Sequence, residues 1–168
     1  ENPSGADAIY VVEIEGGGLD HIARGTMPRI DVAGAWVAFK ANSVWSDGPI
    51  HRIGVRGTGD QVVSAADGHH PDISADGERI VYTSVGDPLG SNPEGNREIF
   101  LWDAGATSQL TVTASGDNTG PAISGDGAFV YFVSTSPIFE DDWLVRRVRY
   151  RIEGCGGSLV RGGAGRGV

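Results

Sequence analysis

Cysteine, basic residues and long apolar runs are all scarce in this chain, and each scarcity excludes a class of protein. The 168 residues contain one cysteine, Cys155, which excludes both a disulfide scaffold and zinc-finger spacing. No apolar run approaches the roughly 20 residues that a membrane-spanning helix requires. Glycine is abundant, at 27 residues, but follows no Gly-X-Y period, which excludes collagen. What is left is a Gly-rich globular chain of a length that suits one domain.

Charge is distributed unevenly along the chain. Residues 1–143 carry 7 basic and 21 acidic side chains, whereas residues 144–168 carry 6 arginines and one acid, Glu153. The net charge of −9 argues against nucleic acid as a partner, because phosphate contacts need basic side chains. Three interpretations of the Arg-rich end stay open: a strand followed by a frayed tail, an anion-binding segment, or a segment that docks on a second chain.

Three segments align without gaps and define an internal repeat. They begin at prolines 43 and 50 residues apart and share the frame Pro-x-Ile-x-x-x-Gly-x-x-(Val/Ile)-x-(Phe/Tyr). The segments are Pro28–Phe39, Pro71–Tyr82 and Pro121–Phe132. Five matched positions in each of three copies are hard to obtain by chance, so the chain is expected to be built from repeated structural units.

Each copy is followed by a second unit that reads as strand, turn and strand. Within the second copy, Ile80 and Tyr82 share one face, which is the period of two of a β-strand. Asp76-Gly77 and Asp126-Gly127 lie between short apolar runs and predict two-residue hairpins, while Ala33-Gly34 predicts a weaker turn. Further strands are expected at 9–14, 19–22, 50–55, 61–63, 99–103, 109–111, 150–153 and 158–160. No segment indicates a helix, so the predicted fold is all-β.

The repeat resembles that of the TolB-type β-propeller family, in which each copy folds into a four-stranded antiparallel blade. The resemblance rests on Pro71-Asp-Ile-Ser-Ala-Asp-Gly-Glu-Arg-Ile-Val-Tyr82, followed by Glu98-Ile-Phe-Leu-Trp-Asp103 and Gln109-Leu-Thr111. The first copy departs from the motif, with Asp31 and Ala33 where the motif has Ser and Asp. The resemblance implies protein or peptide binding, often in the periplasm or outside the cell, and such repeats also occur as accessory domains of peptidases.

The repeat predicts one partial β-propeller over residues 1–168. Its expected parts are a half blade at 8–27, blades at 28–70, 71–120 and 121–163, and a flexible tail at 164–168. These parts supply 14 strands, too few to close alone into a ring of roughly four to eight four-stranded blades. Three alternatives stay open: a fragment of a longer propeller, a homodimer whose 28 strands equal seven blades, and an open arc with protected edges.

His69, His70 and Asp72 flank the proline that opens the second repeat. In a propeller, the first strand of each blade lines the central channel, so these residues are expected near one channel mouth. Two imidazoles and a carboxylate suit a metal or an anionic ligand. Adjacent side chains in an extended strand diverge, however, so the two imidazoles are not expected to bind one ion, and no metal site is assigned. The alternative interpretation is a polar loop at the channel mouth.

Six residues of the repeat are interpreted as structural turn residues. Asp and Ser side chains accept backbone N–H bonds in turns, and Gly supplies the backbone conformation. Because a turn is needed in every blade and a catalytic residue only once, the recurrence of this set argues against catalysis. The six residues are Ser74, Asp76, Gly77, Ser124, Asp126 and Gly127.

No pattern in the sequence supports nucleophilic catalysis. Ala122 stands where a Gly-x-Ser-x-Gly elbow around Ser124 would need its first glycine, and nothing in the sequence places a histidine beside Cys155. The loop Asp87–Glu98 and the run Glu140–Asp142 are rich in oxygen ligands, so calcium is a weak candidate ligand. The Asp-x-Asp-x-Asp-Gly spacing of a calcium loop is missing, and exposed acidic loops are the alternative.

The predicted function is therefore a non-catalytic binding or scaffold module for a protein, a peptide or a small ligand. Propellers present variable loops on a rigid body, and function on such folds depends on the site that they carry. The alternative is the propeller part of a hydrolase, peptidase or lyase whose active site needs a second chain or a further domain. Convergent acids and a histidine in the channel favour the enzyme, whereas small and apolar channel residues favour binding.

Overall fold

The computed structural model describes residues 7–41, 46–136, 146–151 and 158–160, and all regular structure within these ranges is β-strand. The predicted all-β class is confirmed. The strands are β1 (Ala8–Val12), β2 (Leu19–Arg24), β3 (Thr26–Ile30), β4 (Trp36–Lys40), β5 (Gly48–Gly54), β6 (Gln61–Ile73), β7 (Arg79–Ser84), β8 (Glu98–Asp103), β9 (Ala106–Gln109), β10 (Asn118–Ile123), β11 (Phe129–Ser134), β12 (Arg146–Arg151) and β13 (Ser158–Val160).

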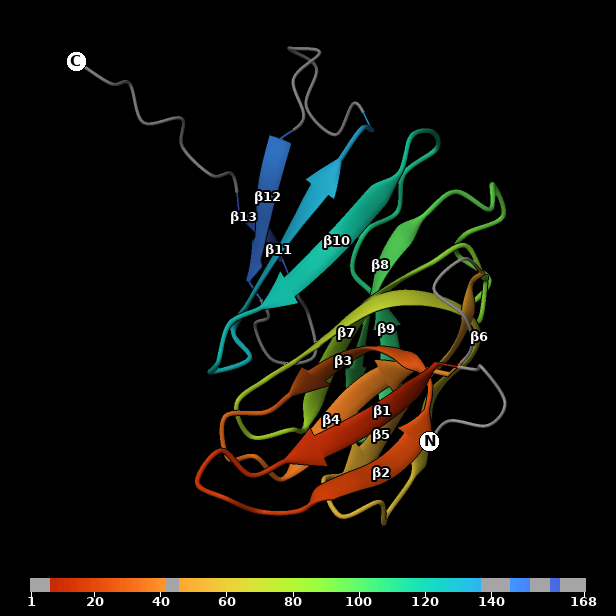
Figure 1. The fold of residues 1–168 in the computed structure, drawn as a ribbon. Helices are drawn as coiled ribbons and strands as arrows, with labels where there is room; N and C mark the ends of the chain where they lie inside the picture. Colours follow the sequence, from red (N-terminus) through yellow and green to blue (C-terminus); the bar gives the residue numbers. More distant parts are fainter. Residues whose placement is uncertain (1–6, 42–45, 137–145, 152–157, 161–168) are drawn as a thin grey trace, which may run out of the picture.

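The strands form three antiparallel sheets that do not close into a ring (Figure 1). β1 and β2 form a hairpin, β3 to β9 form a seven-stranded sheet, and β10 to β13 form a four-stranded sheet, each in sequence order. The long strand β6 explains the seven-stranded sheet, because its first residues pair with β5 and its last residues pair with β7. The outer strand expected at 61–63 and the inner strand of the next repeat are thus one continuous strand. The Arg-rich segment 146–151 is a strand between β11 and β13.

Each repeat-opening strand contains the same β-bulge. In β3, β6 and β10 the register shifts across the residue that precedes the repeat's proline. That residue has a positive φ in all three copies: 56° at Met27, 49° at His70 and 59° at Gly120. Proline has no N–H to donate to the ladder, so strand pairing is interrupted there, and the extra residue is accommodated as a bulge.

The Asp-Gly turns are longer than the two-residue hairpins predicted for them. Ser74 N–H donates to Arg79 O at 2.9 Å, so four residues lie in the loop, and Ser124 makes the same bond to Phe129 O at 2.8 Å. The serine hydroxyl accepts the N–H of Arg79 or Phe129 and donates to the aspartate two residues on. The side chains, rather than a tight backbone turn, therefore determine this loop.

Asp31 alone replaces the Ser–Asp pair in the first copy. Its Oδ1 accepts the N–H groups of Ala35 and Trp36 at 2.7 and 3.2 Å, whereas the later copies divide the equivalent bonds between serine and aspartate. A carboxylate at the serine position reaches both donors, so the departure from the motif at Asp31 and Ala33 leaves the loop intact.

The two-residue hairpin occurs instead between β8 and β9. Asp103 pairs with Ala106, and the intervening Ala104 and Gly105 have φ values of 45° and 104°. Two successive positive φ values are typical of a type I′ turn. This tight turn starts β9 at Ala106, three residues before the strand that the sequence predicts at 109–111.

Three separate hydrophobic clusters form the core. Both faces of β7 are buried: Ile80 and Tyr82 join β5 and β8 residues in one cluster, and Val81 joins β11 residues in the next. Tyr82 stacks on Phe100 with ring centroids 5.7 Å apart. A third cluster packs Ile9 of β1 and other β1–β2 residues against β4 and β5. Burial on both faces explains the continuous apolar runs Ile80–Tyr82 in β7 and Ile99–Trp102 in β8.

Candidate functional site

His69 and His70 lie at the end of the sheets where β3 and β10 begin and where β6 passes from β5 to β7. Gly68, just before them, pairs with Gly48 at the start of β5 and with Ser84 at the end of β7. The loop between β7 and β8 starts from this same end. The two histidines therefore stand beside segments that are long and polar, which is where a binding site is expected.

The two imidazoles converge, contrary to the prediction that adjacent side chains diverge. Their Nδ1 atoms lie 2.7 Å apart and their ring centroids 4.1 Å apart. The cause is the bulge, because a φ of 49° at His70 turns its side chain toward that of His69. At this distance one Nδ1 donates a hydrogen bond and the other accepts it.

His70 lies at the surface, with its imidazole partly buried and positively charged side chains nearby. Partial burial is the main reason that its pKa is lowered, and His69, Arg97, Arg29 and Lys40 lower it further. Each of these effects disfavours the imidazolium. His70 is therefore held in its neutral form at neutral pH, with its nitrogens serving as hydrogen-bond partners or metal ligands.

Asp72 connects three repeat-opening strands. Its Oδ2 accepts the backbone N–H of Ile123 in β10 at 2.9 Å, and its Oδ1 lies 3.7 Å from Nε of Arg29 in β3. Burial raises the pKa of the Asp72 carboxyl, against the hydrogen bonds and the Arg29 charge, which lower it. The residue predicted as part of a ligand site is thus also a structural link, because it pairs an N–H on the open edge of β10.

An ion pair lies on the same end of the sheets. Arg97 donates two parallel hydrogen bonds to Asp47, both at 3.1 Å, and joins the segment before β5 to the segment before β8. Its backbone N–H donates to Asp117 Oδ1 at 2.9 Å. A bidentate arginine–carboxylate pair has a fixed geometry, so it holds the segments before β5 and β8 in place relative to each other.

The loop from Asp87 to Glu98 is organised by its own side chains. Asn92 is 2% exposed and donates to the carbonyls of Val85, Gly86 and Asn96. Asp87 is engaged as well, since its Oδ1 accepts the Asn92 N–H at 2.8 Å. Within 7–41, 46–136 and the two short C-terminal strands, no three His, Cys, Asp or Glu side chains gather around one point. Glu140–Asp142 and Cys155 lie outside the described residues.

Glu98 is a fully buried carboxylate that the sequence did not reveal. It accepts hydrogen bonds from the side chains of Thr111, Thr113, Asn96 and Asn118 and from the Thr113 N–H. These donors tie the segment after β9 and the start of β10 to β8. The buried Glu98 carboxylate thus has hydrogen-bond donors for both of its oxygens, and a ligand cannot reach it. We therefore assign Glu98 a structural role.

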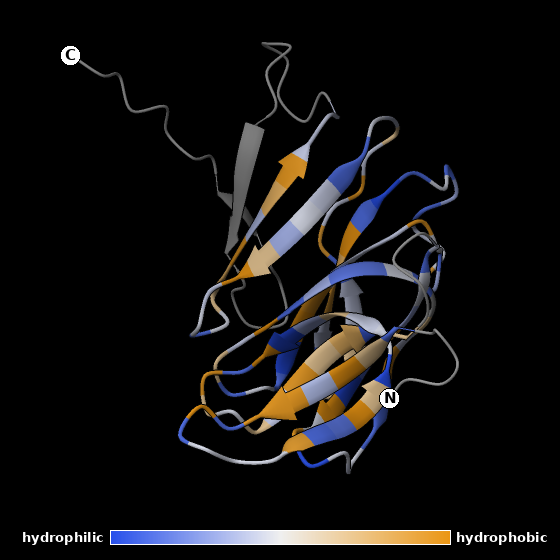
Figure 2. Ribbon diagram, in the orientation of Figure 1, coloured by the Kyte–Doolittle hydropathy of each residue, from blue (hydrophilic) through white to orange (hydrophobic). Residues whose placement is uncertain are grey.

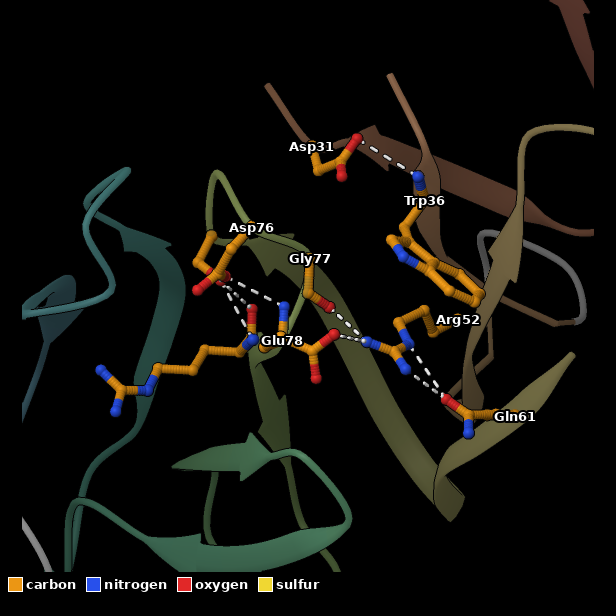
Figure 3. A network of polar contacts seen from close by, with 9 residues as sticks. Asp31, Trp36, Arg52, Gln61, Asp76, Gly77 and Glu78 are labelled. Carbon is orange, nitrogen blue, oxygen red and sulfur yellow. Dashed lines mark hydrogen bonds and ion pairs between the residues drawn. The ribbon is translucent and has the colours of Figure 1, made fainter. Parts of the chain in front are cut away.

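Arg52 forms a second buried centre at the opposite end of the sheets (Figure 3). Its guanidinium lies between the rings of Trp36 and Trp102, 4.3 and 4.8 Å from their centroids. Nε and Nη2 donate to Gln61 Oε1, and Nη1 donates to Gly77 O at 2.6 Å. Arg79 repeats the last contact one unit further on, donating to Gly127 O at 3.1 Å.

These two arginines show what the Asp-Gly turns do beyond reversing the chain. In each case a side chain from one unit binds the glycine carbonyl of the turn in the next unit. The carbonyls of Gly77 and Gly127 therefore hold adjacent units together. Neither turn brings the carboxylate of Asp76 or Asp126 toward the histidines, and both carboxylates accept bonds within their own loops.

Comparison with solved structures places this architecture among the β-propellers. TolB from Acinetobacter baumannii is 18% identical with a TM-score of 0.61, and the match covers 95% of this chain and 39% of that one. A structure assigned as TolB from Agrobacterium tumefaciens is 18% identical with a TM-score of 0.64, covering 94% and 57%. The β-propeller domain of the Trilobed protease from Pyrococcus furiosus is 13% identical with a TM-score of 0.57, covering 82% and 41%.

Other similar structures include prolyl endopeptidases and an oligogalacturonate lyase in complex with manganese, at 15% and 21% identity. No family model and no curated protein matches the chain. The matches to TolB and to the Trilobed protease cover 39%, 57% and 41% of those chains, so this chain spans less than two thirds of their length. In the part of the chain that the structure describes, there is no helix long and apolar enough to cross a membrane.

The chain therefore has a TolB-like β-propeller fold, present as an incomplete ring. The resemblance inferred from the repeat is confirmed at the level of the fold.

Proposed function

We propose that this chain is a non-catalytic binding module that takes a peptide or protein ligand at the end where His69 and His70 lie. The observation that carries the proposal is the bulge shared by β3, β6 and β10. The same backbone conformation recurs three times, but the residue at its apex differs: Met27, His70 and Gly120. A constant backbone with variable side chains is what a rigid scaffold offers to a ligand.

The side chains at these apices suit a peptide. Met27 is half-buried and His70 exposed, so β3 presents a flexible apolar side chain and β6 a polar ring. The exposed His70 ring is neutral, so its Nε2 either accepts or donates a hydrogen bond, depending on the tautomer. Such a nitrogen matches an N–H or a C=O group of a peptide backbone.

A random linear peptide library displayed on phage tests this proposal directly. We expect selected peptides to lose at least about tenfold in affinity, or about 1.4 kcal/mol, for His70→Gly. Glycine accepts a positive φ, so this variant removes the imidazole and keeps the bulge. The control is Arg56→Ala, in the exposed turn after β5 at the opposite end. A library that enriches no peptide, or equal binding by His70→Gly, contradicts the proposal.

The alternative is that the chain is the propeller part of a peptidase or lyase, and the similar structures that belong to such enzymes support it. Their likeness concerns the fold alone at these identities, and no catalytic group is assigned here. Mass spectrometry of the selected peptide after incubation with the chain separates the two. An intact peptide is expected of a binding module, and specific cleavage would favour the enzyme.

We further propose that two copies assemble through the β1–β2 hairpin. One face of this hairpin packs on β4 and β5, while Tyr10, Val12 and Leu19 on the other are 44%, 60% and 68% exposed. β1 is apolar along most of its length (Figure 2). Val12 and Leu19 are directly opposite across the hairpin. A second copy suits this face because residues 1–143 carry a net charge of −14 and residues 144–168 one of +5.

Light scattering on a size-exclusion column tests the assembly. We expect a mass about twice the 17.5 kDa of the chain, and a monomer for Val12→Lys. A wild-type monomer contradicts the dimer and would instead indicate that further blades of a longer chain cover this face.

A further inference from the structure

We propose that His69 and His70 form a two-imidazole site for a divalent transition metal with octahedral or tetragonal preference, such as Ni²⁺ or Cu²⁺. The site coincides with the proposed ligand site and deepens that function, since a bound metal would add an anchoring point for a ligand. The two Nδ1 atoms converge to within 2.7 Å of each other.

The distance between the two nitrogens matches one class of metal. Imidazole nitrogens lie about 2.0–2.1 Å from a bound metal, so two nitrogens 2.7 Å apart subtend an angle of about 80° at the ion. Octahedral and square-planar sites need about 90°, which a small opening of the pair would provide. A tetrahedral site needs about 110°, and the nitrogens would have to separate by more than half an ångström.

The bulge makes this geometry possible and recurs for a structural reason. Adjacent side chains of a regular strand point to opposite faces, so a His-His dipeptide in a strand would present one ring to each face. The positive φ of His70 overrides this alternation. Gly120 has the same conformation with no atoms within 4 Å of where a Cβ would stand, so the bulge itself does not require an imidazole.

The cationic side chains near His70 each have a carboxylate partner. Three cations face His70: Arg97 is paired with Asp47, Arg29 lies 3.7 Å from Asp72, and the Lys40 amine is attracted by Asp47 and Asp7. These carboxylates reduce the repulsion that a divalent ion would meet from the three side chains.

Metal binding needs one proton to change position. In the resting pair, one ring carries its proton on Nδ1 and shares it with the other Nδ1. When both Nδ1 atoms bind the metal, that proton leaves through solvent and the ring is reprotonated on Nε2. Both imidazoles stay neutral, and no net proton is released at neutral pH. Water, or an oxygen or nitrogen atom of the ligand, fills the other coordination positions.

Calorimetric titration of the wild-type chain with NiCl₂, with no peptide present, tests the site. We expect one equivalent of Ni²⁺ to bind, and His70→Gly to weaken binding by more than about tenfold. Loss of a mere hydrogen-bond partner of a metal ligand already costs about 10–100-fold, and here a ligand itself is lost. His21→Ala is the matched control, because His21 is exposed on β2 and contacts Tyr10 away from the site.

Transplanting the pair gives a gain of function. The third repeat has Thr119 and Gly120 at the same bulge, with Gly120 exposed. The double substitution Thr119→His and Gly120→His is expected to raise the stoichiometry from one to two equivalents of Ni²⁺. The Cu²⁺ electron paramagnetic resonance spectrum of the wild type should show two nitrogen ligands, and that of His70→Gly fewer.

Absence of Ni²⁺ binding, or equal binding by His70→Gly, overturns the metal site. Loss of binding in His21→Ala would also overturn it, because the ion would then lie elsewhere. These outcomes are independent of the peptide selection. A chain that binds metal but no peptide retains the site and refutes the proposed function, and the converse result does the opposite.

Discussion

Replacing Arg52 tests whether its buried guanidinium holds two propeller units together. The side chain is 7% exposed and joins β5 to the Gly77 turn of the next unit. Its ion pair with Glu78 contributes little, because Glu78 is 49% exposed and water screens the charge. The contacts that matter are the Gly77 carbonyl and the faces of Trp36 and Trp102.

Arg52→Met is expected to lower the free energy of unfolding by about 2–3 kcal/mol. The buried Gly77 carbonyl loses its charged donor, which costs about 1–3 kcal/mol. Loss of two cation–π contacts costs about 0.5–1 kcal/mol each, and methionine's contact with the rings offsets part of this. Gln61 is exposed and turns to water. Arg52→Lys keeps a cation near Gly77 but loses the planar guanidinium with its several N–H donors. It is expected to lower the free energy of unfolding by about 1 kcal/mol.

Urea unfolding monitored by tryptophan fluorescence measures these changes. With a slope of about 1–3 kcal/mol per molar urea, Arg52→Met should move the midpoint down by about 1 M without changing the slope. The control Arg56→Met, in the exposed turn after β5, should stay within about 0.5 kcal/mol of wild type. An Arg52→Met variant as stable as the control would refute the reasoning. A lysine variant less stable than the methionine variant would show that desolvation of the charge outweighs its contacts.

Two further predictions concern close packing and pH. Gly68→Ala should destabilise by about 1–3 kcal/mol, because its Cβ would collide with the side chain of Ile50, whereas Gly125→Ala makes only an ordinary contact and should be near neutral; thermal unfolding of both compares them. The Ser74 hydroxyl, with a backbone N–H, lowers the pKa of Asp76 below its ordinary 3.8, so the ionised side chain stabilises the fold above that pH. The stability difference between wild type and Asp76→Asn should therefore be present at pH 7 and shrink as the pH falls below 3.8. An unchanged difference at pH 3 would contradict this assignment.

The sequence was sufficient for the all-β class and for the order of the strands. Both depend on local signals, namely the apolar alternation around Ile80 and the repeated Pro-x-Ile frame, which act within a few residues. The limits of individual strands were less predictable. β9 starts early because Ala104 adopts a positive φ, which an alanine does not signal.

Contacts between units lay beyond the sequence. Arg52 reaches Gly77 across 25 positions, and the donors of Glu98 come from residues up to 20 positions away. Nothing in the local pattern distinguishes such residues from exposed charges, because their burial is decided when adjacent sheets pack. One signal was present, however. Gly120 stands where the other copies have Met27 and His70, and a glycine at an aligned position indicates a backbone with positive φ.

The alignment of Met27, His70 and Gly120 raises the question of why position 70 is a histidine and not a glycine. A residue other than glycine with positive φ costs roughly 1–2 kcal/mol, and Gly120 shows that glycine satisfies the bulge. If position 70 served the fold alone, glycine would be the more stable choice there. The His70→Gly variant should accordingly be at least as stable as wild type, although it lacks the imidazole contact with His69. If the His70→Gly variant keeps its stability but loses ligand binding, the strained backbone at His70 serves function rather than folding. Strained residues persist where a side chain must be presented in one direction.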